Sequence, residues 1–373
     1  MKIAYVACGN LVKNSGVPKK FNYQVDAWRD AGAEVEFFCV TPDAGKPGLL
    51  MNGVLVHREE SANPLKQWRN DRKAFGEMVE RVKEWEPDLV YLRWGFHKPE
   101  YCEIARNFPT VIELNGDVLR TAILSGKCSK GPRRLLGRYT QLTLPWLLKE
   151  AAGFLAVTHE VGKLDYVKKW GKPVCVVPNS INLEEYSVLP APKPENSKPR
   201  IALLANMAPW HGLDKVLDFA DTVADVLDFD VIGTDGAGLK SQPNVHFHGY
   251  LERDEFLEVL GSCDVGLDGT ALYRKQMDEA CALKVREYLA SGLPVMICAN
   301  DTTFMDVDPD WLLKLGNFEG NLLENRDKIV EFCRRMAGNR VAHTQTSAYI
   351  HATDVEKARV EFFERIISEN RSS

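Results

Sequence analysis

Two glutamates in the second half of the chain, Glu279 and Glu287, have a spacing that suits ligand binding. Apolar residues follow Glu287 at helical spacing as far as Ser291-Gly292, and Pro294 then leads into the strand-like run VMIC. A Gly just past a helix and a Pro just beyond it are typical helix stop signals. We therefore expect Glu287 on the helix of a βαβ unit and Glu279 in the loop ahead of it, where α/β sheets bind ligands. A carboxylate in this place suits a ribose diol, because it accepts two hydrogen bonds.

Short apolar runs alternate with amphipathic segments along the chain, which predicts βαβ units and parallel sheets. The first half contains IAYVAC, VEFFCV, LVYLRW, TVIEL, FLAVT and VCVVP, and the second half contains IALLAN, FDVIG, VHFHG, DVGLD and VMICA. A chain of 373 residues is long enough for two α/β domains. We expect an N-terminal domain over residues 1–188, a stiff Pro-rich linker over 189–200, a C-terminal domain over 201–345 and a last helical segment over 346–373.

Composition argues against several other classes of protein. The net charge of −5 gives no general attraction to nucleic acid or to an anionic membrane. The nine cysteines are scattered singly without a C-x-x-C pair, which argues against a disulfide framework. The first residues are predicted to form a strand rather than a signal peptide, and no apolar run is long enough to span a membrane. We expect a reduced, cytoplasmic protein.

Four motifs, in order along the chain, resemble those of the GT-B glycosyltransferases, and of family 4 in particular. They are Asp88–Arg93 (D-x-x-Y-x-R), Val177–Asn182 (VPNSIN, beside the family's VPNGID), Pro209–Leu213 (beside P-x-K-G-x) and the E-x7-E pair with its LK..EY residues. The resemblance implies two Rossmann-like domains that face each other across a cleft, with the last helix packed back on the first domain. It also implies retaining, metal-independent hexosyl transfer from a nucleotide sugar, in polysaccharide or glycoconjugate biosynthesis.

The same resemblance assigns roles to residues of the second domain. Glu287 would bind the donor ribose, and Glu279 would lie beside the donor sugar. Asn206 and His211 stand where the family usually has an Arg and a Lys that clamp the diphosphate. Both can donate hydrogen bonds, but neither carries a guaranteed positive charge at pH 7. His211 is either a phosphate donor or a loop-packing residue, and Lys284 is the best cation left for the phosphates.

Four further residues are assigned to the donor nucleotide. Gly16 lies in the loop between the first strand and the next predicted helix, so that the backbone can approach a ligand and the helix can offer free N–H groups to a phosphate. The pattern is not G-x-G-x-x-G, so dinucleotide binding is not indicated. Gly233 lies in a run that resembles the family's strand and Gly loop. The backbone at Tyr250 and Leu251 would contact the base, which leaves the base itself undetermined.

Residues of the first domain would contact the acceptor or the transferred sugar. Asn115 stands where many relatives have a His, and Asp117 lies two residues later. The two side chains either bind sugar hydroxyls or form a turn. Arg93 ends the D-x-x-Y-x-R run. We expect Lys19 and Lys20 to be solvated.

The segment over residues 127–149 mixes basic residues with Leu, Tyr and Trp. It is either a peripheral membrane contact or a packed helix with a solvated basic face. We expect His97 and His159 to be packed or exposed rather than catalytic. No His or Cys cluster has metal-ligand spacing, so we predict no metal and no cofactor.

The sequence thus predicts a retaining glycosyltransferase that moves a sugar from a nucleotide sugar to a glycan, lipid-linked or small-molecule acceptor. Two alternatives stay open, a nucleotide-sugar epimerase on the same fold and a non-catalytic nucleotide-sugar-binding subunit. The donor sugar, the acceptor, the pathway and the oligomeric state are not specified by these motifs.

Overall fold

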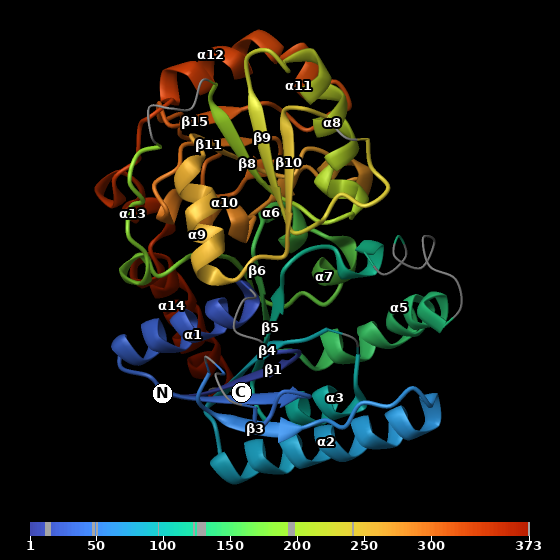
Figure 1. Cartoon of the computed structure of the whole chain (residues 1–373). Coiled ribbons are helices and arrows are strands. Elements are labelled where there is room, and N and C mark those ends of the chain that lie inside the picture. Colours follow the sequence, from blue (N-terminus) through green and yellow to red (C-terminus); the bar gives the residue numbers. More distant parts are fainter. Residues whose placement is uncertain are drawn as a thin grey trace. The chain divides into compact units, whose positions relative to one another are not determined.

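The computed structural model describes residues 1–11, 16–46, 49, 51–95, 97–121, 124, 132–192, 198–240 and 242–371. The chain divides into two compact units, Met1–Pro178 with Val355–Ser373 and Asn179–Asp354. Each unit has its own parallel sheet flanked by helices (Figure 1). This is the α/β class that the alternation of apolar runs predicts.

The first unit contains a seven-stranded parallel sheet with the order β3-β2-β1-β4-β5-β6-β7. Its strands are β1 Lys2–Cys8, β2 Glu34–Thr41, β3 Val54–His57, β4 Leu89–Arg93, β5 Thr110–Leu114, β6 Gly153–Ala156 and β7 Val174–Val176. The strand order reverses between β1 and β4. In open α/β sheets, ligands bind at the carboxyl ends of the strands beside such a reversal.

Helices cover both faces of this sheet. They are α1 Gly16–Asp30, α2 Pro64–Trp85, α3 Pro99–Asn107, α5 Pro132–Glu150, α6 His159–Gly162, α7 Asp165–Lys168 and most of α14 Ala352–Arg371. Among the described residues, no helix is both long enough and apolar enough to cross a membrane.

An aromatic cluster joins the sheet of the first unit to α1 and α14. The Trp28 ring stacks on Tyr5 and meets the edges of Tyr91 and Phe363 at centroid distances of 5.1 and 5.0 Å. Trp28 also donates from Nε1 to a carboxylate oxygen of Glu356 at 2.9 Å. Such aromatic pairs add to the free energy gained from burial, so α14 is part of the core of this unit although it ends the chain.

The second unit contains a six-stranded parallel sheet with the order β10-β9-β8-β11-β13-β15. Its strands are β8 Arg200–Leu204, β9 Asp228–Ile232, β10 Val245–Gly249, β11 Val265–Leu267, β13 Val295–Ile297 and β15 Leu312–Lys314. A separate two-stranded sheet pairs β12 Glu279–Ala280 with β14 Asn300–Asp301. Every apolar run predicted as a strand overlaps one of the observed strands, whereas β3, β12, β14 and β15 have no predicted counterpart.

Six α-helices and three short 3₁₀ turns of the described chain surround these sheets in the second unit. The α-helices are α8 Leu213–Thr222, α9 Arg253–Ser262, α10 Leu283–Ala290, α11 Asn321–Glu324, α12 Arg326–Met336 and α13 His343–Ile350. The turns are η1 Leu183–Glu185, η2 Pro209–His211 and η3 Leu272–Lys275. Here the strand order reverses between β8 and β11, and α10 connects β11 to its parallel neighbour β13. The predicted βαβ unit with Glu287 on its helix is therefore confirmed.

Candidate functional site

A pocket of about 650 Å³ opens at the carboxyl ends of β8, β9 and β10 in the second unit. Its lining consists of Asn206, Met207, Ala208, Gly233, Thr234, Asp235, Gly249 and Tyr250. Three residues predicted to bind the nucleotide, Asn206, Gly233 and Tyr250, thus lie together although they come from three different βα loops. The volume is within the range of small-molecule sites.

The shape of this pocket depends on the absence of a side chain at Gly233. Its φ is +105°, and a Cβ there would lie 2.7 Å from the carbonyl oxygen of Ala205. The Gly233 N–H donates to the Gly249 carbonyl oxygen at 2.7 Å, and the Gly249 N–H donates to Thr234 at 3.1 Å. These bonds hold the loops after β9 and β10 together. At Gly233 and Gly249 the pocket wall is therefore backbone, which a ligand can approach closely.

The predicted base-contacting residues differ in their surroundings. The Tyr250 side chain is 87% exposed at the rim of the pocket. Leu251 is partly buried and packs against the core of the second unit. Leu251 therefore anchors the loop, and Tyr250 is left open to a ligand.

His211 lies at the end of η2, close to Asn206. The Nδ1 atom of His211 accepts the backbone N–H of Asn206 at 3.0 Å, so a neutral ring must have its proton on Nε2. Burial, together with the charge of Lys284, lowers the pKa of His211 to about 4. Gly212 follows with a φ of +68°, and a Cβ there would lie 2.1 Å from Thr270 Oγ1. His211 is thus a neutral hydrogen-bond donor at pH 7, held by a turn that requires glycine.

Lys284 is in the first turn of α10, and both Lys284 and His211 border Gly269. The Lys284 Nζ donates to the Leu204 carbonyl oxygen at 2.7 Å and lies 3.9 Å from Asp268 Oδ1. Burial lowers the pKa of Lys284, although the negative charge of Asp268 acts to raise it. A Cβ on Gly269 would lie 3.9 Å from Lys284 Nζ and 3.7 Å from His211 Cα. The two residues predicted to face the diphosphate are therefore neighbours.

Asp268 was not among the predicted site residues. It directly follows β11, at the reversal of strand order, and burial raises its pKa despite the nearby Lys284. Its position after a strand beside this reversal is a signal that sequence reasoning could have used.

The two glutamates of the E-x7-E pair lie in different secondary-structure elements and have different neighbours. Glu287 is half-buried on α10, and the Tyr186 hydroxyl donates to its Oε1 at 3.4 Å. Glu279 lies in the two-residue strand β12, opposite Asn300 of β14. The expectation of a loop at Glu279 is thus wrong, because this short parallel pairing gives its backbone a fixed partner.

Arg286, which the sequence did not single out, holds this pairing in place. Its guanidinium is fully buried and binds both carboxylate oxygens of Asp301 in β14. Its Nε donates to the Asn179 carbonyl oxygen at 3.0 Å. Such a two-pronged bond fixes both position and orientation. Arg286 therefore positions β14 and, through it, Glu279.

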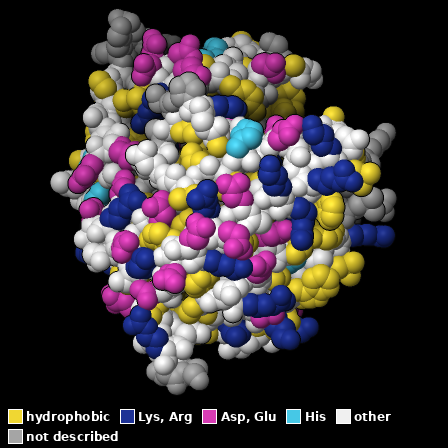
Figure 2. Space-filling view, turned by 90° about the horizontal axis from the view of Figure 1, so that it is seen from below, with side chains coloured by type: hydrophobic (Ala, Val, Ile, Leu, Met, Phe, Trp, Pro, Cys, Tyr) yellow, Lys and Arg dark blue, Asp and Glu magenta, His cyan; other side chains and the backbone are white. Residues whose placement is uncertain are grey.

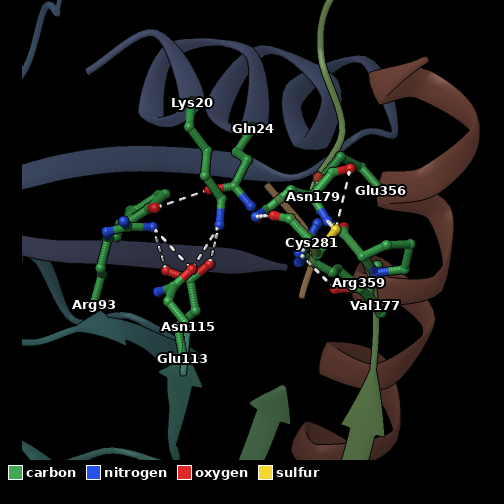
Figure 3. Close-up of polar contacts among 12 residues, drawn as sticks. Lys20, Gln24, Arg93, Glu113, Asn115, Val177, Asn179, Cys281, Glu356 and Arg359 are labelled. Atoms are coloured by element: carbon green, nitrogen blue, oxygen red, sulfur yellow. Dashed lines mark hydrogen bonds and ion pairs between the residues drawn. The ribbon is translucent and has the colours of Figure 1, made fainter. Parts of the chain in front are cut away.

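In the first unit, polar side chains gather at the carboxyl ends of β4 and β5 (Figure 3). Glu113 accepts from Lys20 Nζ at 2.5 Å and from Arg93 Nη1 at 2.8 Å. Asn115 Oδ1 accepts from the same two atoms at 3.1 and 3.4 Å. The predicted residues Arg93 and Asn115 are thus joined in one network. The expectation that Lys20 is solvated is wrong, because this residue is 1% exposed and bound to Glu113.

Asp117 is buried and serves the local turn. Its Oδ1 accepts the Arg120 backbone N–H at 2.9 Å, and the Tyr166 hydroxyl lies 3.4 Å away. Asp117 could either bind sugar hydroxyls or form a turn, and these hydrogen bonds support the turn. Gly16 is the first residue of α1, and residues 12–15 ahead of it lie outside the described part of the chain.

Of the segment over residues 127–149, the structure describes the backbone from residue 132 onward and the side chains from residue 138 onward. On α5, Tyr139, Leu142 and Trp146 are exposed at helical spacing, with 40, 73 and 61% of each residue accessible. Arg138 and Lys149 are exposed on the same helix. Figure 2 shows a hydrophobic patch bordered by Lys and Arg side chains at the right edge of the face seen from below.

No group of three or more His, Cys, Asp or Glu side chains among the described residues has the geometry of a metal site.

Comparisons with known proteins agree with this description. A family model for the glycosyl transferase 4-like domain matches residues 15–180. An alpha-glucosyltransferase solved with UDP-glucose and DNA containing an abasic site superposes with a TM-score of 0.65 at 12% identity, over 97% of this chain and 99% of that one. No curated protein has a significantly matching sequence.

Two further solved structures resemble the whole chain. The lipopolysaccharide outer core galactosyltransferase WaaB has a TM-score of 0.59 at 13% identity, over 99% of this chain and 100% of that one. HepE from Anabaena, in complex with UDP-glucose, has a TM-score of 0.57 at 14% identity, over 100% and 99%. The chain therefore has the fold of the GT-B glycosyltransferases, and its first unit matches the glycosyl transferase 4-like domain over residues 15–180.

Proposed function

We propose that this protein transfers a sugar from a nucleotide-sugar donor to a glycan, lipid-linked or small-molecule acceptor, with retention at the anomeric carbon and without a metal ion. The observation that carries this proposal is the pocket of the second unit, where Asn206, Gly233 and Tyr250 come together at the carboxyl ends of three strands. The proposed donor contacts are the base at Tyr250 and Leu251, and the ribose at Glu287.

The chemical problem is the charge that develops on the departing diphosphate. Without a metal, hydrogen-bond donors and cations of the protein must take it up. Lys284 supplies a positive charge, and His211 supplies a neutral Nε2–H donor from the neighbouring turn. Gly16 would add backbone donors at the start of α1, and Glu279 would position the donor sugar. As the anomeric C–O bond breaks, the acceptor oxygen bonds to the same face of the sugar and its proton passes to the leaving phosphate.

The absence of the family's usual Arg and Lys at the diphosphate keeps one alternative function open. With Asn206 and His211 in place of an Arg and a Lys, Lys284 is the one charged member of the predicted phosphate-binding set. This departure favours a subunit that binds a nucleotide sugar without turning it over as the second candidate. The epimerase alternative has no supporting side chain among the residues described above.

A ligand screen followed by a turnover assay tests the proposal. UDP-glucose is the first donor to try, because two of the similar structures contain it. A donor at 100 times its dissociation constant should raise the free energy of unfolding by about 2.7 kcal/mol. Radiolabelled donor that gives a glycosylated acceptor supports a transferase, and an isomerised nucleotide sugar supports an epimerase. Binding without any turnover supports the non-catalytic subunit, and no shift with any nucleotide sugar refutes the proposal.

We also propose a peripheral contact with the cytoplasmic face of a membrane through the 127–149 segment. Exposed Trp, Tyr and Leu side chains next to Arg and Lys suit the boundary between lipid headgroups and acyl chains. Co-sedimentation with vesicles that contain anionic lipid should exceed that with neutral vesicles. The double variant Leu142→Ser with Trp146→Ser should remain in the supernatant, and equal sedimentation of parent and variant would refute this contact.

A further inference from the structure

The loop between β11 and β12 brings a second lysine to the turn η2, where the predicted phosphate donor His211 lies. This lysine is Lys275, the last residue of η3. Its Nζ atom lies 4.6 Å from the centroid of the Trp210 ring, and Trp210 directly precedes His211 in the chain. Both Lys275 and Trp210 are partly buried. An ammonium group over the face of a Trp ring is attracted by the ring electrons, which favours this position of the lysine.

Side chains of neighbouring elements fix this loop. Arg274 binds both carboxylate oxygens of Asp214 in α8, at 2.8 and 2.7 Å. It also donates to the carbonyl oxygen of Pro209, the first residue of η2, at 3.0 Å. Asn317 accepts the backbone N–H of Tyr273 at 2.8 Å. Because a two-pronged Arg–carboxylate bond fixes orientation as well as position, η3 is held firmly against η2 and α8.

The chain turns sharply directly after this lysine. Gln276 has a φ of +52°, in the left-handed region, and its N–H donates to the Tyr273 carbonyl oxygen at 2.7 Å. Such a conformation is unfavourable for a residue other than Gly and persists where the surrounding contacts hold it. The turn leads to β12, which begins at Glu279. One fixed loop therefore connects the lysine beside η2 with the glutamate predicted to lie beside the donor sugar.

Two lysines from different elements act on the His211 ring. Burial, together with the charges of Lys284 on α10 and Lys275 on η3, lowers the pKa of His211 to about 4. Gly269 lies beside the same turn, where a Cβ would be 3.3 Å from the Trp210 carbonyl oxygen and 3.9 Å from Lys284 Nζ. The neutral N–H donor of His211 therefore has a cation on each of two neighbouring elements.

A departing diphosphate needs more than one positive charge beside it. Both of its phosphate groups are negative, and more charge develops as the sugar leaves. Lys284 and His211 together supply one positive charge and one neutral N–H group. A further ammonium group can balance part of the rest, because its three N–H donors can serve several acceptors at once. In a partly buried site the attraction between such charges is stronger than in water.

We propose that Lys275, positioned by the Trp210 ring, is a second cationic contact for the diphosphate of the donor, in addition to Lys284. The proposal rests on the glycosyl transfer proposed above, and it supplies charge that the family's usual Arg and Lys would otherwise carry. Lys275 binds the phosphates, whereas Trp210 is a positioning residue that acts through Lys275. Recognition of the diphosphate then depends on the β11–β12 loop as well as on α10.

Calorimetric titration of the full chain at pH 7.5 and low salt tests this contact. The probe is whichever of UDP, dTDP, GDP and ADP binds the wild type most tightly. Lys275→Ala should weaken its binding by about tenfold or more, as expected for a lost charge-assisted hydrogen bond. Lys275→Arg keeps the charge over the ring and should restore most of the affinity. High salt should reduce the difference between wild type and Lys275→Ala, which a folding defect would not do.

The position of Lys328 offers a matched control. It is an exposed lysine of α12, and Lys328→Ala should bind the probe like the wild type. Affinity of Lys275→Ala within twofold of that of the wild type overturns the proposal. A loss in Lys275→Ala that Lys275→Arg does not restore, or that high salt leaves unchanged, also overturns it.

A double-mutant cycle tests the role of Trp210. If the ring acts through the lysine, Trp210→Ala should weaken binding, and the double variant Trp210→Ala with Lys275→Ala should be no weaker than Lys275→Ala alone. Trp210→Phe keeps an aromatic face and should retain most of the affinity. Losses that simply add in the double variant refute the positioning role.

The same titrations separate this proposal from the proposed function. Wild-type protein that binds one of the four nucleoside diphosphates, with Lys275→Ala binding it equally well, contradicts the Lys275 contact alone. Wild-type protein that binds none of them contradicts the glycosyl transfer and, with it, this contact.

Discussion

Acidification should destabilise the first unit through one buried histidine, His97. Its side chain packs against α5, and the centroid of its ring lies 6.0 Å from that of Tyr139 and 6.3 Å from that of Trp146. It is 1% exposed, and neither ring nitrogen has a hydrogen-bond partner among the described residues. Burial, with a smaller contribution from Lys98, lowers its pKa to about 4. His97 is therefore neutral in the folded protein at pH 7.

The direction of the effect follows from proton linkage. The unfolded chain binds the proton at the ordinary histidine pKa near 6.5, and the folded chain only near 4. Between these values the unfolded state holds more protons, so the free energy of unfolding falls as the pH falls. By pH 4.5 the loss from this one group is about 2.5 kcal/mol, whereas at pH 7.5 it is close to zero.

Urea unfolding of His97→Phe and of the parent, between pH 7.5 and pH 4.5, measures this term. Phe keeps the aromatic packing and removes the proton site. The stability difference in favour of the variant should therefore grow by about 2.5 kcal/mol as the pH falls. The exposed His159 offers a matched control, since His159→Phe should follow the parent at every pH. Parallel pH profiles for His97→Phe and the parent would refute the reasoning.

Three further predictions concern the donor site. Glu287→Ala should weaken UDP binding by roughly 1.5–3 kcal/mol, since a charge-assisted hydrogen bond is lost, and unchanged affinity by calorimetry would exclude the ribose role. Lys284→Ala should reduce kcat by about 10²–10³ with a smaller change in donor affinity, whereas turnover within a few-fold of the parent would mean that another group holds the phosphates. Treatment with EDTA should leave turnover intact, and a loss that Mg²⁺ or Mn²⁺ restores would contradict a metal-independent mechanism.

The fold class and the order of the main elements follow from the sequence itself. Period-2 and buried apolar runs, separated by amphipathic segments, predict parallel strands and crossover helices, because each element must bury its own apolar face. The end of α10 at Ser291-Gly292 also follows from local sequence, because a Gly just past a helix is a typical stop signal. Asn206, Gly233 and Tyr250 were assigned from the resemblance to family 4 motifs. The structure brings them together because each lies in the loop after a strand, and the carboxyl ends of parallel strands meet at one edge of a sheet.

The surroundings of individual charged side chains were decided only by the tertiary structure. Lys20 looks like a solvated lysine in the sequence, and its partner Glu113 is 93 residues away in the chain. Arg286 looks like an ordinary helix residue, yet Asp301 and Asn179 satisfy its guanidinium in the interior. Burial of a charge depends on partners from distant strands, and no local periodicity encodes which of them will meet. The sequence determined the fold class and most of the strands, and the packing of those elements determined which charges are held inside.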